Sequence, residues 1–170
     1  MLVLISDTHG SDTHRLEGRT LQAVRDAEVV VHAGDFCEPA VLTAFEQASK
    51  SFLGVYGNND GDVIRSRLPE SRVVEYGNTR LAVCHTRRGG RQELSLFGRQ
   101  ENADAVVYGH SHRPGIDEDG PIPLVNPGSH AQSRGHGLAH AELQVADDGL
   151  DGQLLSPQGD TLRSFSIQSD

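Results

Sequence analysis

The feature that most constrains the fold is a series of short apolar runs separated by stretches with helical spacing. Residues 2–5, 29–31 and 52–56 are apolar at almost every position, which is typical of strands buried on both faces of a parallel or mixed sheet. Between these runs, apolar residues recur at helical intervals over 16–27 and 40–48, and Pro39 suits the first turn of the second helix. The alternation predicts an α/β fold.

The second half of the chain is richer in predicted strands. Runs at 73–76 and 80–84 flank Gly77-Asn78, which predicts a hairpin. A helix is expected over 92–102, and further strands over 105–108, 122–125, 138–145, 150–155 and 162–167. One sheet can hardly hold so many strands in 170 residues, so we expect two packed mixed β-sheets flanked by helices, a four-layer α/β/β/α sandwich. With no repeat and no linker, residues 1–170 form one predicted domain.

Hydropathy and cysteine content bear on the compartment. No apolar run approaches the roughly 20 residues that a membrane span requires, and the opening run lacks a basic flank before it reaches Asp7. We therefore interpret it as a strand and expect a cytoplasmic protein without a membrane partner. Cys37 and Cys84 form no CxxC motif, which suits a reduced compartment.

The charge balance restricts the binding partners. The chain has 15 basic and 24 acidic residues, a formal net charge of −9, and no basic stripe for a long polyanion. Nucleic acid is therefore not expected as an obligate partner, whereas a nucleotide-sized substrate stays open. Lys50 is the sole lysine. This acidic, lysine-poor composition is equally consistent with a high-salt habitat and with a GC-rich genome.

Polar residues follow five of the predicted strands directly, several of them beside a glycine. They are Asp7 and His9 after the first strand, Asp35 after the second, Asn58, Asn59 and Asp60 after the third, His85 after the strand at 80–84, and His110 and His112 after the strand at 105–108. In open α/β sheets, ligands bind at the carboxyl ends of the strands. The sequence therefore predicts one functional site at that edge.

The chemical types in this set indicate a metal centre. Without Asn59 and Asp60, seven residues remain, and they supply two carboxylates, one amide and four imidazoles, with no thiolate. Such donors suit manganese, iron, zinc, cobalt or nickel. Seven ligands exceed one tetrahedral site, but two cations about 3.5–4 Å apart that share a carboxylate would use them all. Taken singly, Asp7 or Asp35 could cap a helix, and a lone histidine is more often structural. The common strand-end position argues against coincidence, whereas His32, inside an apolar strand, is expected in the core.

In this order, Asp-x-His, Gly-Asp, Gly-Asn-x-Asp, His and Gly-His-x-His resemble the calcineurin-like metallophosphoesterases. The short chain and the segment Asn126-Pro127-Gly128-Ser129 are most similar to the small archaeal and bacterial phosphodiesterases of that superfamily, which are related in fold to a eukaryotic retromer subunit. The resemblance covers Met1 to about Ser129. It implies the four-layer metallophosphoesterase sandwich, with the remaining residues in its second sheet.

The resemblance also implies roles for individual residues. Asp7, His9 and His112 would hold one divalent cation, Asn58, His85 and His110 a second one, and Asp35 would bridge the two. The nucleophile would be a metal-bound hydroxide, with no side-chain nucleophile. Asp60 would steady the loop behind the ligands. Asn126, Gly128 and Ser129 would lie on the substrate side, although a plain Pro-Gly turn explains this segment equally well.

One position departs from the wider superfamily, in which Gly-Asn-His-Asp/Glu supplies a histidine that assists the leaving group. This chain has Asn59 there, and an amide cannot donate a proton as an imidazolium can. General-acid help is typically worth about 10²–10⁴-fold in rate. We therefore expect slow turnover that favours substrates with acidic leaving groups.

The function expected from these features is hydrolysis of a small phosphodiester or nucleotide with two divalent cations. Manganese is the first candidate metal, with nickel, iron, cobalt and zinc as alternatives. A phosphomonoesterase on the same site is the first rival. A catalytically silent scaffold of the same fold is the second rival, disfavoured because all seven expected ligands are present. Exposed sheet edges would allow a homodimer.

Overall fold

The computed structural model describes residues 1–169. The helices are α1 (Gly18–Asp26), α2 (Pro39–Ala48), α3 (Asp62–Arg67) and α4 (Arg91–Gln100). The strands of one sheet are β1 (Leu2–Ile5), β2 (Val29–His32), β3 (Phe52–Gly54), β9 (His140–Ala146), β10 (Gly149–Leu155) and β11 (Thr161–Gln168). The strands of the other are β4 (Ser71–Tyr76), β5 (Thr79–Cys84), β6 (Ala105–Val107), β7 (Gly115–Asp117) and β8 (Leu124–Asn126).

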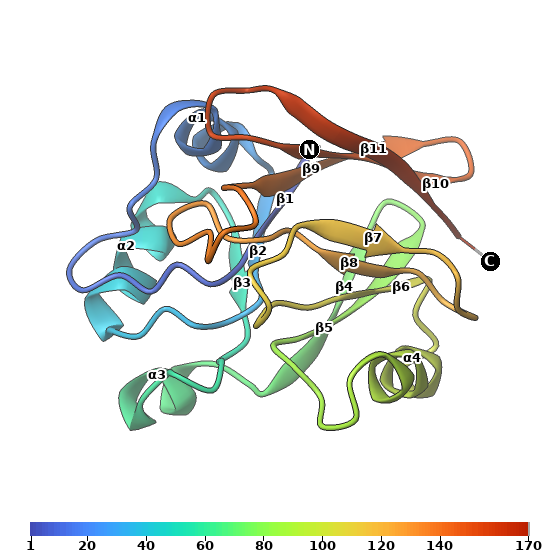
Figure 1. Ribbon diagram of the computed structural model, residues 1–170, viewed down its shortest axis with the longest axis horizontal. Coiled ribbons are helices and arrows are strands. Elements are labelled where there is room, and N and C mark those ends of the chain that lie inside the picture. The colour runs from blue at the N-terminus through green and yellow to red at the C-terminus, as the bar shows by residue number, and fades with distance from the viewer. Residues whose placement is uncertain (170) are drawn as a thin grey trace.

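The two sheets pack face to face, with helices on their outer faces (Figure 1). The strand orders are β11-β10-β9-β1-β2-β3 and β4-β5-β6-β8-β7. The predicted α/β fold of two mixed sheets flanked by helices is confirmed. Within residues 1–169, no helix is long and apolar enough to cross a membrane.

Three apolar layers hold the four structural layers together. Leu2 and Leu4 of β1 belong to the core between the sheets, whereas Val3 and Ile5 pack under α1 and α2. A third cluster fills the space between the second sheet and α4, around Leu94. Burying each such side chain stabilises the fold by roughly 1.5–3 kcal/mol. Burial on both faces explains why the central strands are apolar at successive positions.

Two elements were not predicted, and several predicted boundaries were wrong by up to two residues. The strands after Ser129, expected in the second sheet, instead extend the sheet of β1, in which β9 pairs with β1. Helix α3 and strand β7 have only 6 and 3 residues, too few to produce a periodic pattern. Helix α1 begins at Gly18, because Glu17 before it has an extended backbone. The parallel pairs that matter for function are β1–β2, β2–β3 and β5–β6, since they direct five carboxyl ends toward the same edge of the sandwich.

Candidate metal centre

The loops that follow these five strands are hydrogen-bonded to one another. The Asp7 and His9 amides donate to the carbonyls of Gly34 and Asp35, each at 3.0 Å, and the Gly109 amide donates to the His85 carbonyl at 3.0 Å. The loops therefore form one surface across the ends of both sheets. The structure brings together there all seven residues that the sequence predicted as ligands: Asp7, His9, Asp35, Asn58, His85, His110 and His112.

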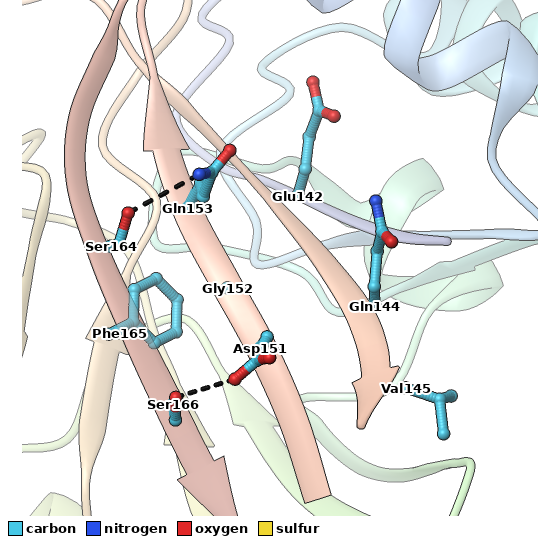
Figure 2. A pocket seen from close by; sticks show the side chains of 9 residues that line it. All are labelled: Glu142, Gln144, Val145, Asp151, Gly152, Gln153, Ser164, Phe165 and Ser166. Atoms are coloured by element: carbon cyan, nitrogen blue, oxygen red, sulfur yellow. Dashed lines mark hydrogen bonds between the residues drawn. The ribbon is translucent and has the colours of Figure 1, made fainter. Parts of the chain in front are cut away.

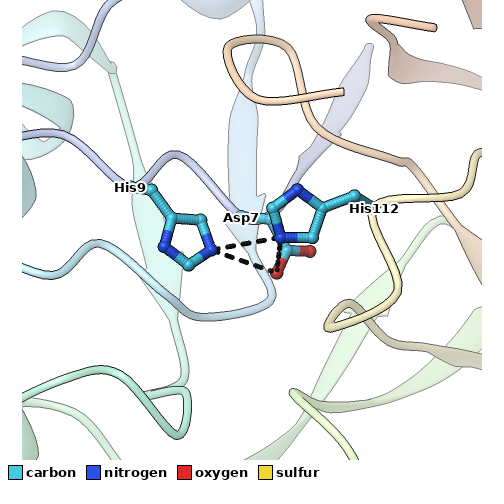
Figure 3. Close-up of side chains that lie close together, drawn as sticks. All are labelled: Asp7, His9 and His112. Atoms are coloured by element: carbon cyan, nitrogen blue, oxygen red, sulfur yellow. Dashed lines mark hydrogen bonds and ion pairs between the residues drawn. The ribbon is translucent and has the colours of Figure 1, made fainter. Parts of the chain in front are cut away.

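One group of ligand atoms comes from Asp7, His9 and His112, which Figure 3 shows pointing toward a common centre. The Nε2 atoms of His9 and His112 lie 3.2 Å apart. They lie 3.8 and 3.4 Å from Oδ1 of Asp7. Asp7 and His112 are fully buried, and the His9 side chain is 11% exposed. The group is therefore a nearly closed cluster of one carboxylate and two imidazoles.

The protonation of these rings shows what the cluster can bind. The Nδ1 atom of His112 donates to the Gln132 carbonyl, so its Nε2 presents a lone pair to the cluster. Burial lowers the pKa of His112 and favours this neutral form. On the outer side of His9, Nδ1 lies 3.2 Å from Sγ of Cys37. Two Nε2 atoms 3.2 Å apart beside a carboxylate suit a shared cation.

A second group surrounds Oδ1 of Asn58. Nε2 of His85 lies 3.0 Å from this oxygen, and Nδ1 of His110 lies 2.9 Å from it. Nδ1 of His85 donates to the Ala33 carbonyl at 2.7 Å, which leaves Nε2 as the ligand atom. His110 is exposed, so this group forms the open side of the centre.

Asp35 lies between the two groups. Its Oδ2 is 3.4 Å from Nε2 of His9 and 3.3 Å from Nε2 of His85. Asn59 donates to both oxygens, from its backbone amide at 2.9 Å and from Nδ2 at 2.7 Å. Burial by itself would raise the pKa of Asp35, but His85 and Asn59 hold it well below its usual range. Burial by itself would lower the pKa of His85, but Asp35 outweighs burial, so this pKa is raised.

The charge balance of the centre calls for a cation. Asp7 and Asp35 are 0% and 1% exposed, and within residues 1–169 their ion-pair partners are histidines. Buried carboxylates without a full counter-charge are costly. Oxygen and imidazole donors at these separations fit a divalent metal. The residues present therefore fit the metal that the sequence predicted.

The ligand loops are strained. Five residues of the predicted set have a left-handed backbone: Asp7 (φ 54°), His9 (45°), Asp35 (65°), His110 (72°) and His112 (57°). Each costs about 1–2 kcal/mol in a residue with a Cβ atom. Such strain persists only where the surrounding structure fixes the backbone, and it clusters at functional sites.

Asp60 supplies much of that fixation. Its Oδ1 accepts the amides of Phe36 and Cys37, both at 2.8 Å, and its Oδ2 accepts those of Asp35 and Gly57, at 3.0 and 2.7 Å. The side chain is 3% exposed. One carboxylate therefore joins the loop that carries Asp35 to the loop that carries Asn58.

Asn126, Gly128 and Ser129 do not line an open substrate side, contrary to that expectation. All three are buried. Asn126 donates to the Gly109 carbonyl and accepts the Gly128 amide, at 3.0 and 2.9 Å. Ser129 donates to the Asp7 carbonyl at 2.7 Å and accepts the Gln132 amide at 2.8 Å. Because Gln132 orients His112, this segment positions two candidate ligands from beneath.

Sequence reasoning missed the contacts behind the ligands. Cys37 lies against His9, and its position two residues after Asp35 was the only available signal. No feature of the sequence marks Gln132 as the partner of His112, because any residue provides a backbone carbonyl. Outside the centre, His140 is buried between Thr20 and Glu142, at 3.0 Å from each, and His32 is buried against Phe36.

A separate hollow of about 580 Å³ lies over β9, β10 and β11 (Figure 2). Four of its polar side chains bond in pairs, Ser166 to Asp151 at 2.7 Å and Gln153 to Ser164 at 3.5 Å, and Glu142 bonds to Arg19 and His140. None of the seven candidate ligands lines it. The hollow is therefore separate from the candidate metal centre.

Carboxylates and histidines on the strand-end loops of two packed sheets define a metallophosphoesterase-type centre. The model of the calcineurin-like phosphoesterase superfamily domain matches residues 1–147, and the chain belongs to this superfamily. The resemblance expected from the motifs is therefore confirmed. The family binds divalent metals, in agreement with the donor set.

Two relatives support the same assignment. The chain is 30% identical to a protein of Methanothermobacter thermautotrophicus named a probable metallophosphoesterase, over 99% of both chains. It is 25% identical to a phosphodiesterase of Methanocaldococcus jannaschii, over 74% of this chain and 81% of that one.

The fold is shared with two solved structures. A predicted phosphoesterase from Streptococcus pneumoniae gives a TM-score of 0.74 at 24% identity, over 97% of this chain and 96% of that one. The Vps29 protein of Entamoeba histolytica, solved with zinc, gives a TM-score of 0.78 at 19% identity, over 98% of this chain and 99% of that one. At these identities the two structures show the fold alone.

Proposed function

We propose that this chain is a phosphodiesterase that hydrolyses a small diester or nucleotide with two divalent cations, manganese being the first candidate. Asp7, His9 and His112 would hold one cation, Asn58, His85 and His110 the other, and Asp35 both. The observation that carries this proposal is the position of Asp35: its Oδ2 lies 3.4 and 3.3 Å from the Nε2 atoms of His9 and His85, one histidine from each group.

When bound, the two cations would supply a water-derived nucleophile near neutral pH and positive charge beside the phosphoryl oxygens. The chain's own residues hold this arrangement in place. Asn59 fixes the Asp35 carboxylate, and the Gln132 and Ala33 carbonyls fix the tautomers of His112 and His85. In the reaction, a P–O bond forms from water as the P–O bond to the leaving alcohol breaks, which yields a phosphomonoester and an alcohol.

The leaving group receives little help from Asn59. Its Nδ2 donates to Oδ2 of Asp35 at 2.7 Å, and an amide is not an acid at neutral pH. The proposed enzyme therefore favours alcohols that depart without a proton. Rates for aryl diesters should rise steeply as the pKa of the leaving phenol falls. The phosphodiesterase among the relatives also supports the choice of diesters.

The test measures metal content and activity together. Protein treated with chelator is reconstituted with Mn²⁺ and assayed on bis(4-nitrophenyl) phosphate and on 4-nitrophenyl phosphate. We expect two metals per chain and faster diester turnover. The Asp35→Asn variant should lose the bound metals and the diester turnover. Asp147 is an exposed loop residue, so the Asp147→Asn variant should keep the metals and the turnover.

Other outcomes would redirect the assignment. Faster turnover of the monoester would identify a phosphomonoesterase. A folded protein that binds metal but cleaves neither ester with Mn²⁺, Ni²⁺, Fe²⁺, Co²⁺ or Zn²⁺ would be a scaffold, and the proposal would be wrong.

A further inference from the structure

A cavity of about 300 Å³ opens beside the exposed side of the metal centre. It is lined by Tyr56, Gly57, Asn58, Arg65, Glu70, His85, Thr86 and Arg88. Two of these residues, Asn58 and His85, are candidate ligands of the second cation. A substrate whose phosphoryl group lies at the centre would therefore place an adjoining group in this cavity.

The cavity is cationic in a protein with a formal net charge of −9. Arg65 and Arg88 both line it. The one acidic residue, Glu70, is 68% exposed and lies 3.9 Å from another arginine, Arg87. A local excess of positive charge on an acidic protein attracts anions to that point of the surface.

Arg65 is held rigidly at the cavity wall. Its Nε donates to the Asp60 carbonyl at 2.7 Å, its Nη2 lies 3.3 Å from the Gly57 carbonyl, and its guanidinium stacks over the Tyr56 ring, 4.7 Å from the centroid. Carbonyl partners leave its charge uncompensated. Within residues 1–169, Nη1 has no hydrogen-bond partner, so two of its five N–H donors are unused.

Arg88, unlike Arg65, is not held in place by other protein groups that the structure describes. It is exposed, and in the described part of the chain no ion pair or side-chain hydrogen bond engages it. Arg87, its neighbour, is instead engaged with Glu70 and with the Phe97 ring. A guanidinium without a protein partner beside a fixed one suits a group with several acceptor oxygens.

We infer that this cavity binds a second phosphoryl group of the substrate, so that the preferred substrates are phosphodiesters that also carry a phosphomonoester. The inference rests on the proposed function and specifies its substrate class. The volume is at the lower end of the range for ligand pockets, roughly 300–1,000 Å³. It suits a phosphate on a sugar-sized group better than a whole nucleotide.

The test compares two substrates that differ by one phosphate: the 4-nitrophenyl ester of thymidine 5′-phosphate, and the same ester with a 3′-phosphate. We expect kcat/KM to be about tenfold higher for the bisphosphate. The gain should lie in KM, because the group binds alike in the ground state and the transition state. Arg88→Gln should abolish this preference. Arg99→Gln, which changes the same charge at an exposed site on α4 outside the cavity, should preserve it.

Equal kcat/KM values for the two esters in the wild-type protein, or a preference unchanged by Arg88→Gln, would overturn the inference and leave the proposed function intact. If neither ester is cleaved, the proposed function fails, and binding decides the inference. Calorimetry with the Mn²⁺-loaded protein should then give tighter binding of thymidine 3′,5′-bisphosphate than of thymidine 5′-monophosphate, with the difference lost in Arg88→Gln. Equal dissociation constants would overturn the inference.

Discussion

Replacing Asp60 by asparagine tests how the ligand loops are held. Each oxygen of the Asp60 carboxylate accepts two backbone amides. In the variant, one oxygen becomes an NH₂ group that faces two N–H donors. Losing two hydrogen bonds to a buried charge, each worth about 1.5–3 kcal/mol, should reduce the free energy of unfolding by roughly 3–6 kcal/mol.

Urea unfolding of metal-free protein, followed by circular dichroism, measures this loss. With an m value of about 2 kcal/mol per molar urea, the midpoint should fall by about 2 M. Asp147→Asn is the control, expected within about 0.5 kcal/mol of wild type. Mn²⁺ affinity of the folded variant should fall about 10–100-fold, because Asp60 supports the Asp35 loop. A midpoint for Asp60→Asn equal to that of the control would refute the reasoning.

Two further predictions concern packing and pH. At Gly57 an added Cβ atom would lie 2.1 Å from Oδ1 of Asp35, whereas at Gly61 it would meet nothing within 4 Å. Gly57→Ala should therefore weaken Mn²⁺ binding at least about tenfold, measured by calorimetry. Gly61→Ala is the control and should leave Mn²⁺ binding unchanged. Burial lowers the pKa of His130 to about 4, below an unfolded value of about 6.5, so its contribution to stability is present above pH 6.5 and is lost as pH falls toward 4. Between pH 7 and 5 the loss is about 2 kcal/mol. His130→Gln should therefore flatten the dependence of the urea midpoint on pH over this range, and an unchanged slope would contradict the prediction.

Much of the fold was predictable because burial on both faces leaves a strand apolar at successive positions. The run at 2–5 is the clearest case: Leu2 and Leu4 enter the core between the sheets, and Val3 and Ile5 enter the layer under the helices. Helix α3 was not predictable, since its 6 residues bury only Ile64. Strand β7 is a 3-residue edge strand, too short for any alternation to be recognised.

The candidate ligands were predictable for a related reason. Parallel strands end at a common edge, so a polar residue directly after an apolar run occupies a defined place. Asp35 and His85 follow strands of different sheets, yet their side chains lie 3.3 Å apart. The sequence also indicated that Asp60 supports a loop. It did not indicate that Asp60 binds four amides from two loops.

By itself, the sequence determined the layered α/β fold, the residues at the strand ends and the kind of metal those residues would bind. These depend on residue type and chain order. Only the tertiary structure decided which atoms face the centre, because the tautomers of His85 and His112 depend on carbonyls 52 and 20 residues away. It also buried Ser129 and placed Arg65 and Arg88 around one cavity. These features depend on how distant loops pack, and packing of that kind leaves no periodic signal in the chain.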